Sequence, residues 1–114
     1  MKVHYFPLYG RAEAIRFLLI AAKVDFENVD YSFEEWGKIK DSGKFEFNQL
    51  PALENEGKVL SQSVSILRAL AVKHGYYSSD PHSCWLIDSA IDSVSDIIST
   101  LYSKLFFEKD QQQL

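Results

Sequence analysis

The chain opens with a short alternation of apolar and polar residues, KVHYF at residues 2–6, which stops at Pro7. Alternation is typical of a strand with one buried face, and proline lacks the amide hydrogen of a strand ladder, so we predict a strand ending here. Between Arg11 and Lys23 apolar residues recur every three or four positions, which predicts a helix. Phe26–Ser32 alternates again, so two parallel strands joined by a helix are expected.

The middle of the chain predicts a hairpin. Residues 33–40, FEEWGKIK, suit a short irregular helical turn, and residues 41–49 suit a surface loop. Two short strands, Ala52–Glu54 and Lys58–Leu60, are then expected on either side of a turn. Gly57 lies in that turn and tolerates the positive φ that hairpin turns require, so we predict a β-hairpin.

A further helix is predicted over residues 63–74, with Ser61 or Ser63 as its N-cap and Gly75 just past its end. The order βαβ followed by ββα predicts an α/β fold, a four-stranded mixed sheet with three helices. This order is thioredoxin-like, and we assign it to residues 1–75 as one domain.

A long helix is predicted after a linker at residues 76–82. Its apolar stripe spans residues 83–107, and residues 108–114 read as a frayed tail. A helix of this length extends about 37 Å, whereas a domain of about 80 residues is only about 30 Å across. The apolar residues of its second half are Ile97, Ile98, Leu101, Tyr102, Leu105, Phe106 and Phe107. We therefore expect a partner, or a further part of the protein, to cover this helix.

Three acidic residues, Asp88, Asp92 and Asp96, lie four apart on that helix. Each like-charge step costs about 0.2–0.5 kcal/mol in an isolated helix. One interpretation is a solvated acidic edge. The other is that cations of a second copy face it, which predicts a symmetric dimer in which Arg68 approaches Asp88 or Asp92 of the neighbour.

Composition argues against a nucleic-acid-binding protein, a membrane-spanning protein and a secreted protein. A net charge of −4 and a pI near 5.3 give no electrostatic footprint for nucleic acid. No stretch reaches the roughly 18 apolar residues of a transmembrane segment, and the start lacks the apolar core of a signal peptide. Cys84 is the only cysteine, which fits a reducing compartment, so a cytoplasmic protein is expected. Cys84 itself reads as a half-buried small hydrophobe.

The turn after the first strand holds no cysteine, which argues against thiol–disulfide chemistry in a thioredoxin-like fold. It offers instead the phenol of Tyr5 and the guanidinium of Arg11. The histidines, His4, His74 and His82, lack metal-ligand spacing, so no metal is expected.

Two further groups suit anions. Gln62 and Ser63 begin a predicted helix, where unpaired amides and the helix dipole favour negative charge. Trp36 and Lys40 are four residues apart, so an indole donor and an ammonium can face one carboxylate. Each pair is, by composition alone, more often structural than functional.

Four motifs recur together: HYFPLYGRAEAIRFLL, EEW…K, NQLPALE and LSQSVSILRAL. In order and spacing the chain resembles the cytosolic glutathione transferases over residues 1 to about 107, and the tyrosine-type, sigma-like branch in particular. Chains of that family continue through several more helices. The resemblance therefore implies truncation after the first helix of an all-helical C-terminal domain, with residues 83–107 as that helix.

The resemblance implies that glutathione is the substrate and that the Tyr5 hydroxyl binds its sulfur, with Arg11 supporting the turn. A free thiol has a pKa near 8.5, and lowering it by about 2 units requires about 2.7 kcal/mol of thiolate stabilisation. One charge-assisted hydrogen bond supplies about 1.5–3 kcal/mol. Tyr5 is thus expected to act as a donor to the thiolate.

The same resemblance assigns the rest of the ligand. Trp36 and Lys40 would hold the glycyl carboxylate. The backbone of Leu50, before a cis Pro51, would pair with the cysteinyl unit.

At the other end of the ligand, Gln62 and Ser63 would take the γ-glutamyl carboxylate. Asp96 would reach the γ-glutamyl amine bound by the neighbouring subunit. This role would give one member of the acidic stripe a cationic partner across a dimer.

Two functions remain open. The first is a glutathione transferase that conjugates glutathione to small hydrophobic electrophiles. The second is a non-catalytic, glutathione-transferase-like subunit that docks into a larger assembly through its long helix. In either case a homodimer or a larger protein assembly is expected to cover residues 83–107.

Overall fold

The computed structural model describes the backbone of residues 1–113 and the side chains of residues 1–105. It divides into two compact units, Met1–Tyr76 and Tyr77–Leu114. The first unit contains, in chain order, β1 (Lys2–Tyr5), a 3-10 turn η1 (Gly10–Ala12), α1 (Glu13–Ala21), β2 (Glu27–Asp30), α2 (Phe33–Ile39), β3 (Ala52–Asn55), β4 (Lys58–Ser61) and α3 (Ser63–His74).

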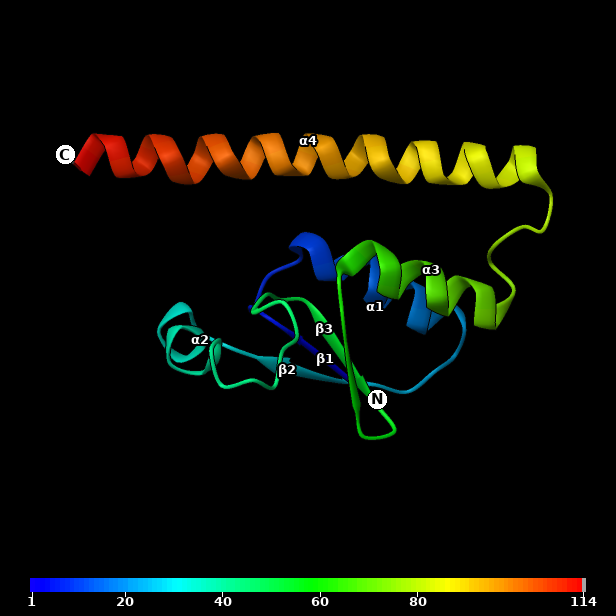
Figure 1. Cartoon of the computed structure of the whole chain (residues 1–114), viewed down its shortest axis with the longest axis horizontal. Helices are drawn as coiled ribbons and strands as arrows, with labels where there is room; N and C mark the ends of the chain where they lie inside the picture. Colours follow the sequence, from blue (N-terminus) through cyan, green and yellow to red (C-terminus); the bar gives the residue numbers. More distant parts are fainter. Residues whose placement is uncertain (114) are drawn as a thin grey trace. The chain divides into compact units, whose positions relative to one another are not determined.

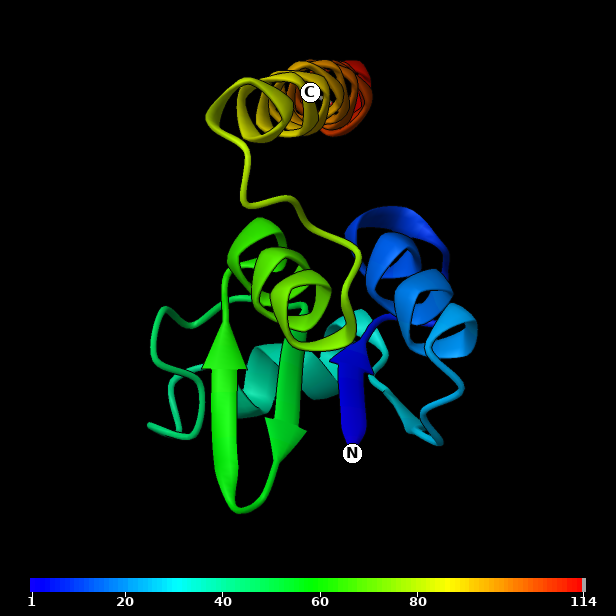
Figure 2. The same cartoon turned by 90° about the vertical axis from the view of Figure 1, so that its right-hand side faces the viewer.

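The four strands form one mixed sheet in the order β2-β1-β3-β4. β1 pairs in parallel with β2 and antiparallel with β3, and β3 pairs antiparallel with β4. Figures 1 and 2 show α1 and α3 together on one face of this sheet. The predicted thioredoxin-like α/β fold is therefore confirmed.

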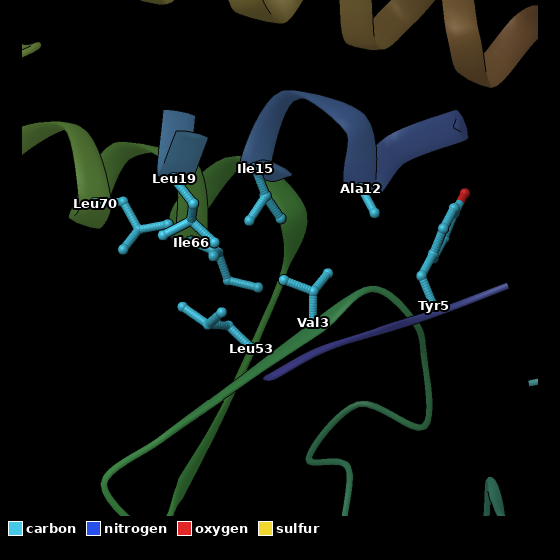
Figure 3. Close-up of a cluster of buried hydrophobic side chains, with 8 residues drawn as sticks. All are labelled: Val3, Tyr5, Ala12, Ile15, Leu19, Leu53, Ile66 and Leu70. Atoms are coloured by element: carbon cyan, nitrogen blue, oxygen red, sulfur yellow. The ribbon is translucent and has the colours of Figure 1, made fainter. Parts of the chain in front are cut away.

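The main core lies between the sheet and the two helices. Val3 and Tyr5 of β1 point toward α1 and α3, because alternate residues of a strand face the same side (Figure 3). The remaining buried members are Ala12, Ile15, Leu19, Leu53, Ile66 and Leu70. Tyr5 thus takes part in the core while its hydroxyl reaches the turn that precedes α1.

A smaller buried group occupies the opposite face of the sheet. His4, between Val3 and Tyr5, is 2% exposed, and Phe45 from the loop before β3 is 1% exposed. Their rings meet edge to face at 5.6 Å between centroids. The sequence pattern missed this group because two aromatic residues, Phe45 and Phe47, in an otherwise polar loop are too few to establish a periodicity.

Two local predictions were wrong. The N-cap of α3 is Gln62, with φ 73°, and neither Ser61 nor Ser63, because Ser61 completes β4 and Ser63 is already helical. α2 is a regular α-helix instead of an irregular turn, because Ser32 caps it by accepting a hydrogen bond from the amide of Glu35 at 3.0 Å.

The second unit contains α4 (Pro81–Gln113). It begins two residues before the predicted start, where Asp80 accepts a hydrogen bond from the Ser83 amide at 2.9 Å, and it continues through the stretch expected to fray. The predicted apolar residues Phe106 and Phe107 lie outside the described side chains. Among the described residues, none of the helices combines the length and apolar character needed to cross a membrane.

Candidate functional site

One cavity of the first unit gathers most of the predicted site residues. It has a volume of about 450 Å³, within the range of small-molecule sites. Its lining is Phe6, Arg11, Trp36, Asn48, Gln49, Leu50, Pro51, Gln62 and Ser63. The structure thus brings together residues from the turn after β1, from α2, from the loop before β3 and from the start of α3.

The start of α3 gives this cavity a positively polarised end. Gln62 adopts a positive φ, and no side chain caps the first turn of the helix. The amides of a first helical turn have no partner within the helix, so such an end favours an anionic group. Arg11 lines the same cavity and adds a full positive charge.

The Leu50-Pro51 peptide bond is cis. It lies directly before β3, an inner strand of the sheet, so the first strand of the hairpin continues from the cavity wall. The cis bond that the resemblance implied is therefore present in the structure.

Tyr5 lies beside the cavity and does not belong to its lining. Its ring is 4% exposed, and its hydroxyl oxygen accepts a hydrogen bond from the Arg11 amide at 3.0 Å. Gly10, with φ 42°, passes so close that a Cβ there would overlap the Tyr5 hydroxyl. An amide that donates to a phenol oxygen draws electron density from it, which makes the phenol a better donor to a third group.

Arg16 holds the turn that carries these groups. Its guanidinium donates to the Leu8 carbonyl at 3.0 Å, to the Glu13 carboxylate at 2.9 Å and to the Asn28 side chain at 3.0 Å. It also lies 5.8 Å from the centre of the Tyr5 ring. Sequence reasoning missed Arg16, because its partners come from three separate segments.

Trp36 and Lys40 behave differently from each other. The Trp36 indole lines the cavity and packs against Phe6, Tyr31 and Phe45, with ring centroids 6.5, 6.1 and 5.1 Å away. Lys40 follows α2, and its amide donates to the Trp36 carbonyl at 2.9 Å, but its side chain is not part of the lining. The structure brings Trp36 into the lining of the cavity and does not bring Lys40 into it.

Asp96 belongs to the second unit, on α4, beside Ile97, Thr100 and Lys104. Earlier on the same helix, both carboxylate oxygens of Asp88 accept from the Tyr77 hydroxyl at 2.8 Å.

This hydrogen bond raises the pKa of Tyr77 above its ordinary value, with burial as a weaker cause. Asp88 therefore has a partner within its own unit that the sequence did not suggest. The approach of Arg68 to Asp88 or Asp92 of a second copy stays a prediction.

Sequence reasoning missed three lining residues, Phe6, Asn48 and Gln49. A signal existed for them, since Phe6 follows Tyr5 directly and the two amides belong to the motif NQLPALE. Within the described part of the chain, no group of three His, Cys, Asp or Glu side chains is placed to hold a metal ion.

Comparison with known proteins gives a consistent result. A family model described as glutathione S-transferase, N-terminal domain, matches residues 1–71. Among curated proteins, glutathione S-transferase alpha-2 of Rattus norvegicus is 35% identical over 112 residues, which is 97% of this chain and 50% of that protein. The chain spans about half the length of the curated relatives it matches.

Solved structures agree. Na-GST-3, described as a monomeric glutathione S-transferase from the hookworm Necator americanus, is 38% identical with a TM-score of 0.79, over 91% of this chain and 50% of that one. Prostaglandin synthase D of Nilaparvata lugens is 32% identical with a TM-score of 0.85, over 98% of this chain and 56% of that one. By the match of its N-terminal domain, this chain belongs to the glutathione S-transferase family.

Proposed function

We propose that the first unit binds glutathione in the cavity and that Tyr5 stabilises the bound thiolate for attack on small hydrophobic electrophiles. The observation that carries this proposal is the lining of one cavity by Arg11, Trp36, the cis Leu50-Pro51 pair and the start of α3, next to the Tyr5 hydroxyl. The family uses glutathione as its substrate.

The ligand's charges suit this lining. Its γ-glutamyl carboxylate would lie at Gln62 and Ser63, where the polarised end of α3 favours an anion. Its cysteinyl unit would pair with the backbone of Leu50. Its glycyl carboxylate would meet the Trp36 indole, with Lys40 reaching it from the margin through a flexible side chain.

The proposed reaction requires one hydrogen-bond donor close to the glutathione sulfur. The Tyr5 hydroxyl donates to the sulfur, whose proton leaves to solvent. The thiolate then forms a carbon–sulfur bond with the electrophile, and the bond to a leaving group, halide in an aryl halide, breaks as that group departs with the electron pair. Arg11 supports Tyr5 through its amide, which donates to the phenol oxygen. A stabilisation of about 2.7 kcal/mol, within reach of one charge-assisted hydrogen bond, lowers the thiol pKa by about 2 units.

The finer assignments belong to this proposal. The chain is of the tyrosine-type, sigma-like branch, it acts in the cytoplasm, and α4 begins a helical C-terminal domain. Asp96 serves the site of a neighbouring subunit in a homodimer. The occurrence of dimers in the family supports this arrangement.

A second candidate is a non-catalytic subunit that docks through α4. It is favoured by apolar side chains of α4 that are exposed among the described residues of that helix. The apolar residues concerned are Trp85, Leu86, Val94, Ile97, Leu101 and Leu105.

Titration of the purified chain with glutathione, followed by a conjugation assay with an aryl halide, separates the two candidates. The enzyme predicts saturable binding and turnover that Tyr5→Phe abolishes. Binding without Tyr5-dependent turnover supports the subunit. No binding at millimolar glutathione rejects the enzyme.

A further inference from the structure

His4 lies on the face of the sheet that points away from α1 and α3, and it is buried despite being titratable. Its Nδ1 lies 2.7 Å from the Tyr31 hydroxyl, and its ring stacks on the Tyr31 ring at 5.8 Å and 21°. Its other ring neighbour is Phe45, at 5.6 Å. Burying an imidazole costs free energy unless its polar atoms form hydrogen bonds. A histidine buried at this position therefore indicates a role that an apolar residue would not fill.

The two rings that His4 holds are the rings on which Trp36 rests. Trp36 lies 6.1 Å from Tyr31 and 5.1 Å from Phe45 between centroids, and it lines the cavity. No residue of α2 is fully buried. The orientation of the indole therefore depends on this aromatic cluster more than on packing of α2 itself.

We propose that His4 is a positioning residue that fixes the Trp36 indole in the cavity through Tyr31 and Phe45. This inference rests on the proposed function only for the identity of the ligand, glutathione, whose binding depends on the orientation of Trp36. The contacts themselves run without interruption from the sheet to the cavity wall.

The charges around His4 are consistent with a neutral ring that accepts a hydrogen bond at Nδ1. Burial lowers the pKa of His4, and the nearby Lys44 and Lys2 act in the same direction. Glu54 acts in the opposite direction, with its carboxylate 3.5 Å from Nε2, the ring nitrogen that carries the hydrogen when Nδ1 accepts. Burial raises the pKa of Tyr31, so its hydroxyl keeps its hydrogen and can donate it to Nδ1 of a neutral ring that carries its own hydrogen on Nε2.

The experiment begins from Trp85→Phe, which leaves Trp36 as the single tryptophan of the chain. In that background His4→Phe keeps an aromatic ring but removes the acceptor. We expect the Trp36 emission maximum and its quenching by acrylamide to change. We also expect the Kd for glutathione, measured by calorimetry, to rise about five- to tenfold, which corresponds to about 1–1.4 kcal/mol.

A double-mutant cycle separates positioning from a general structural effect. In a Trp36→Phe background, His4→Phe should change the glutathione Kd less than twofold. An equal rise in Kd with and without Trp36 would overturn the proposal. So would an unchanged emission and an unchanged Kd in His4→Phe.

Two further variants serve as a substitute for His4→Phe and as a control. If His4→Phe fails to fold, Tyr31→Phe removes the same hydrogen bond while keeping the ring, and it should give the same emission change and the same dependence on Trp36. The control is His82→Phe in the second unit, a histidine that stacks on the ring at position 85, Trp85 in the parent chain at 5.7 Å and phenylalanine in this background. In the Trp85→Phe background it should leave Trp36 emission unchanged.

Failure of the proposed function can be distinguished from failure of the positioning role of His4. If the parent chain binds no glutathione, the proposed function fails, and the emission measurements alone test His4. A changed Trp36 emission in His4→Phe and Tyr31→Phe then upholds the positioning role, and an unchanged emission overturns it.

Discussion

At the scale of single residues, the site depends on a glycine that leaves room for a phenol. Gly10 has φ 42°, which L side chains rarely adopt, and a Cβ there would overlap both the Tyr5 hydroxyl and the Leu8 side chain. The Arg11 amide follows directly and donates to that hydroxyl. Backbone conformation and phenol position are therefore coupled at this turn.

Gly10→Ala is expected to displace Tyr5 from the Arg11 amide. We predict a fall of at least tenfold in kcat/KM for conjugation, because each tenfold loss corresponds to about 1.4 kcal/mol of transition-state stabilisation. The matched control is Gly37→Ala in α2, where a Cβ meets no atom within 4 Å. Equal activity of the two variants would contradict the coupling.

His4 gives a prediction on pH at the same scale. Because burial holds its folded-state pKa below the ordinary 6.5, the neutral form favours folding. Its contribution is complete above pH 6.5 and is lost as pH falls through the folded-state pKa. His4→Gln should therefore lose less unfolding free energy than wild type between pH 7.5 and pH 5.5 in urea titrations. Parallel losses in both proteins would show that another group is responsible.

At the scale of elements, α1 is anchored by a few buried residues. Leu19 is 0% exposed and Ile20 is 62% exposed, although they are neighbours. Leu19→Ala should lower the unfolding free energy by about 2–5 kcal/mol through lost burial and a cavity. Ile20→Ala, the control, should cost less than about 1 kcal/mol. Chemical denaturation measures both, and similar costs would contradict the packing of α1.

The elements themselves could be predicted because their signals are local. Apolar spacing identified the strands and helices, Gly75 marked the end of α3, and the linked motifs identified the family. What escaped prediction depends on distant partners. Gln62 is the N-cap residue of α3 and has a positive φ. Phe45 is buried only because its loop packs against the sheet.

The same distinction applies to the site. Arg11, Trp36, Leu50 and Pro51 carry motif positions, and the structure gathers them in one cavity. His4 carries no such signal, because its role arises from rings contributed by other segments.

At the scale of the whole molecule, opposite charges on Arg68 and Asp92 predict association of two copies of the chain. If Arg68 meets Asp92 of a second copy, light scattering at micromolar concentration should give twice the 13.1 kDa chain mass. Arg68→Glu should weaken this dimer by like-charge repulsion, and adding Asp92→Arg should restore it. A monomeric mass for the wild-type chain would contradict the prediction.

Stabilisation of the glutathione thiolate by Tyr5, as proposed, is measured most directly by the ultraviolet absorbance of the thiolate. Titrated against pH, glutathione bound to the wild-type chain should ionise about 2 units below the ordinary thiol pKa of about 8.5. In Tyr5→Phe, bound glutathione should ionise near the ordinary value, while its Kd measured at about pH 5, where the thiol stays protonated in both proteins, changes little. The same thiol pKa in both proteins, with glutathione bound to each, would contradict the account.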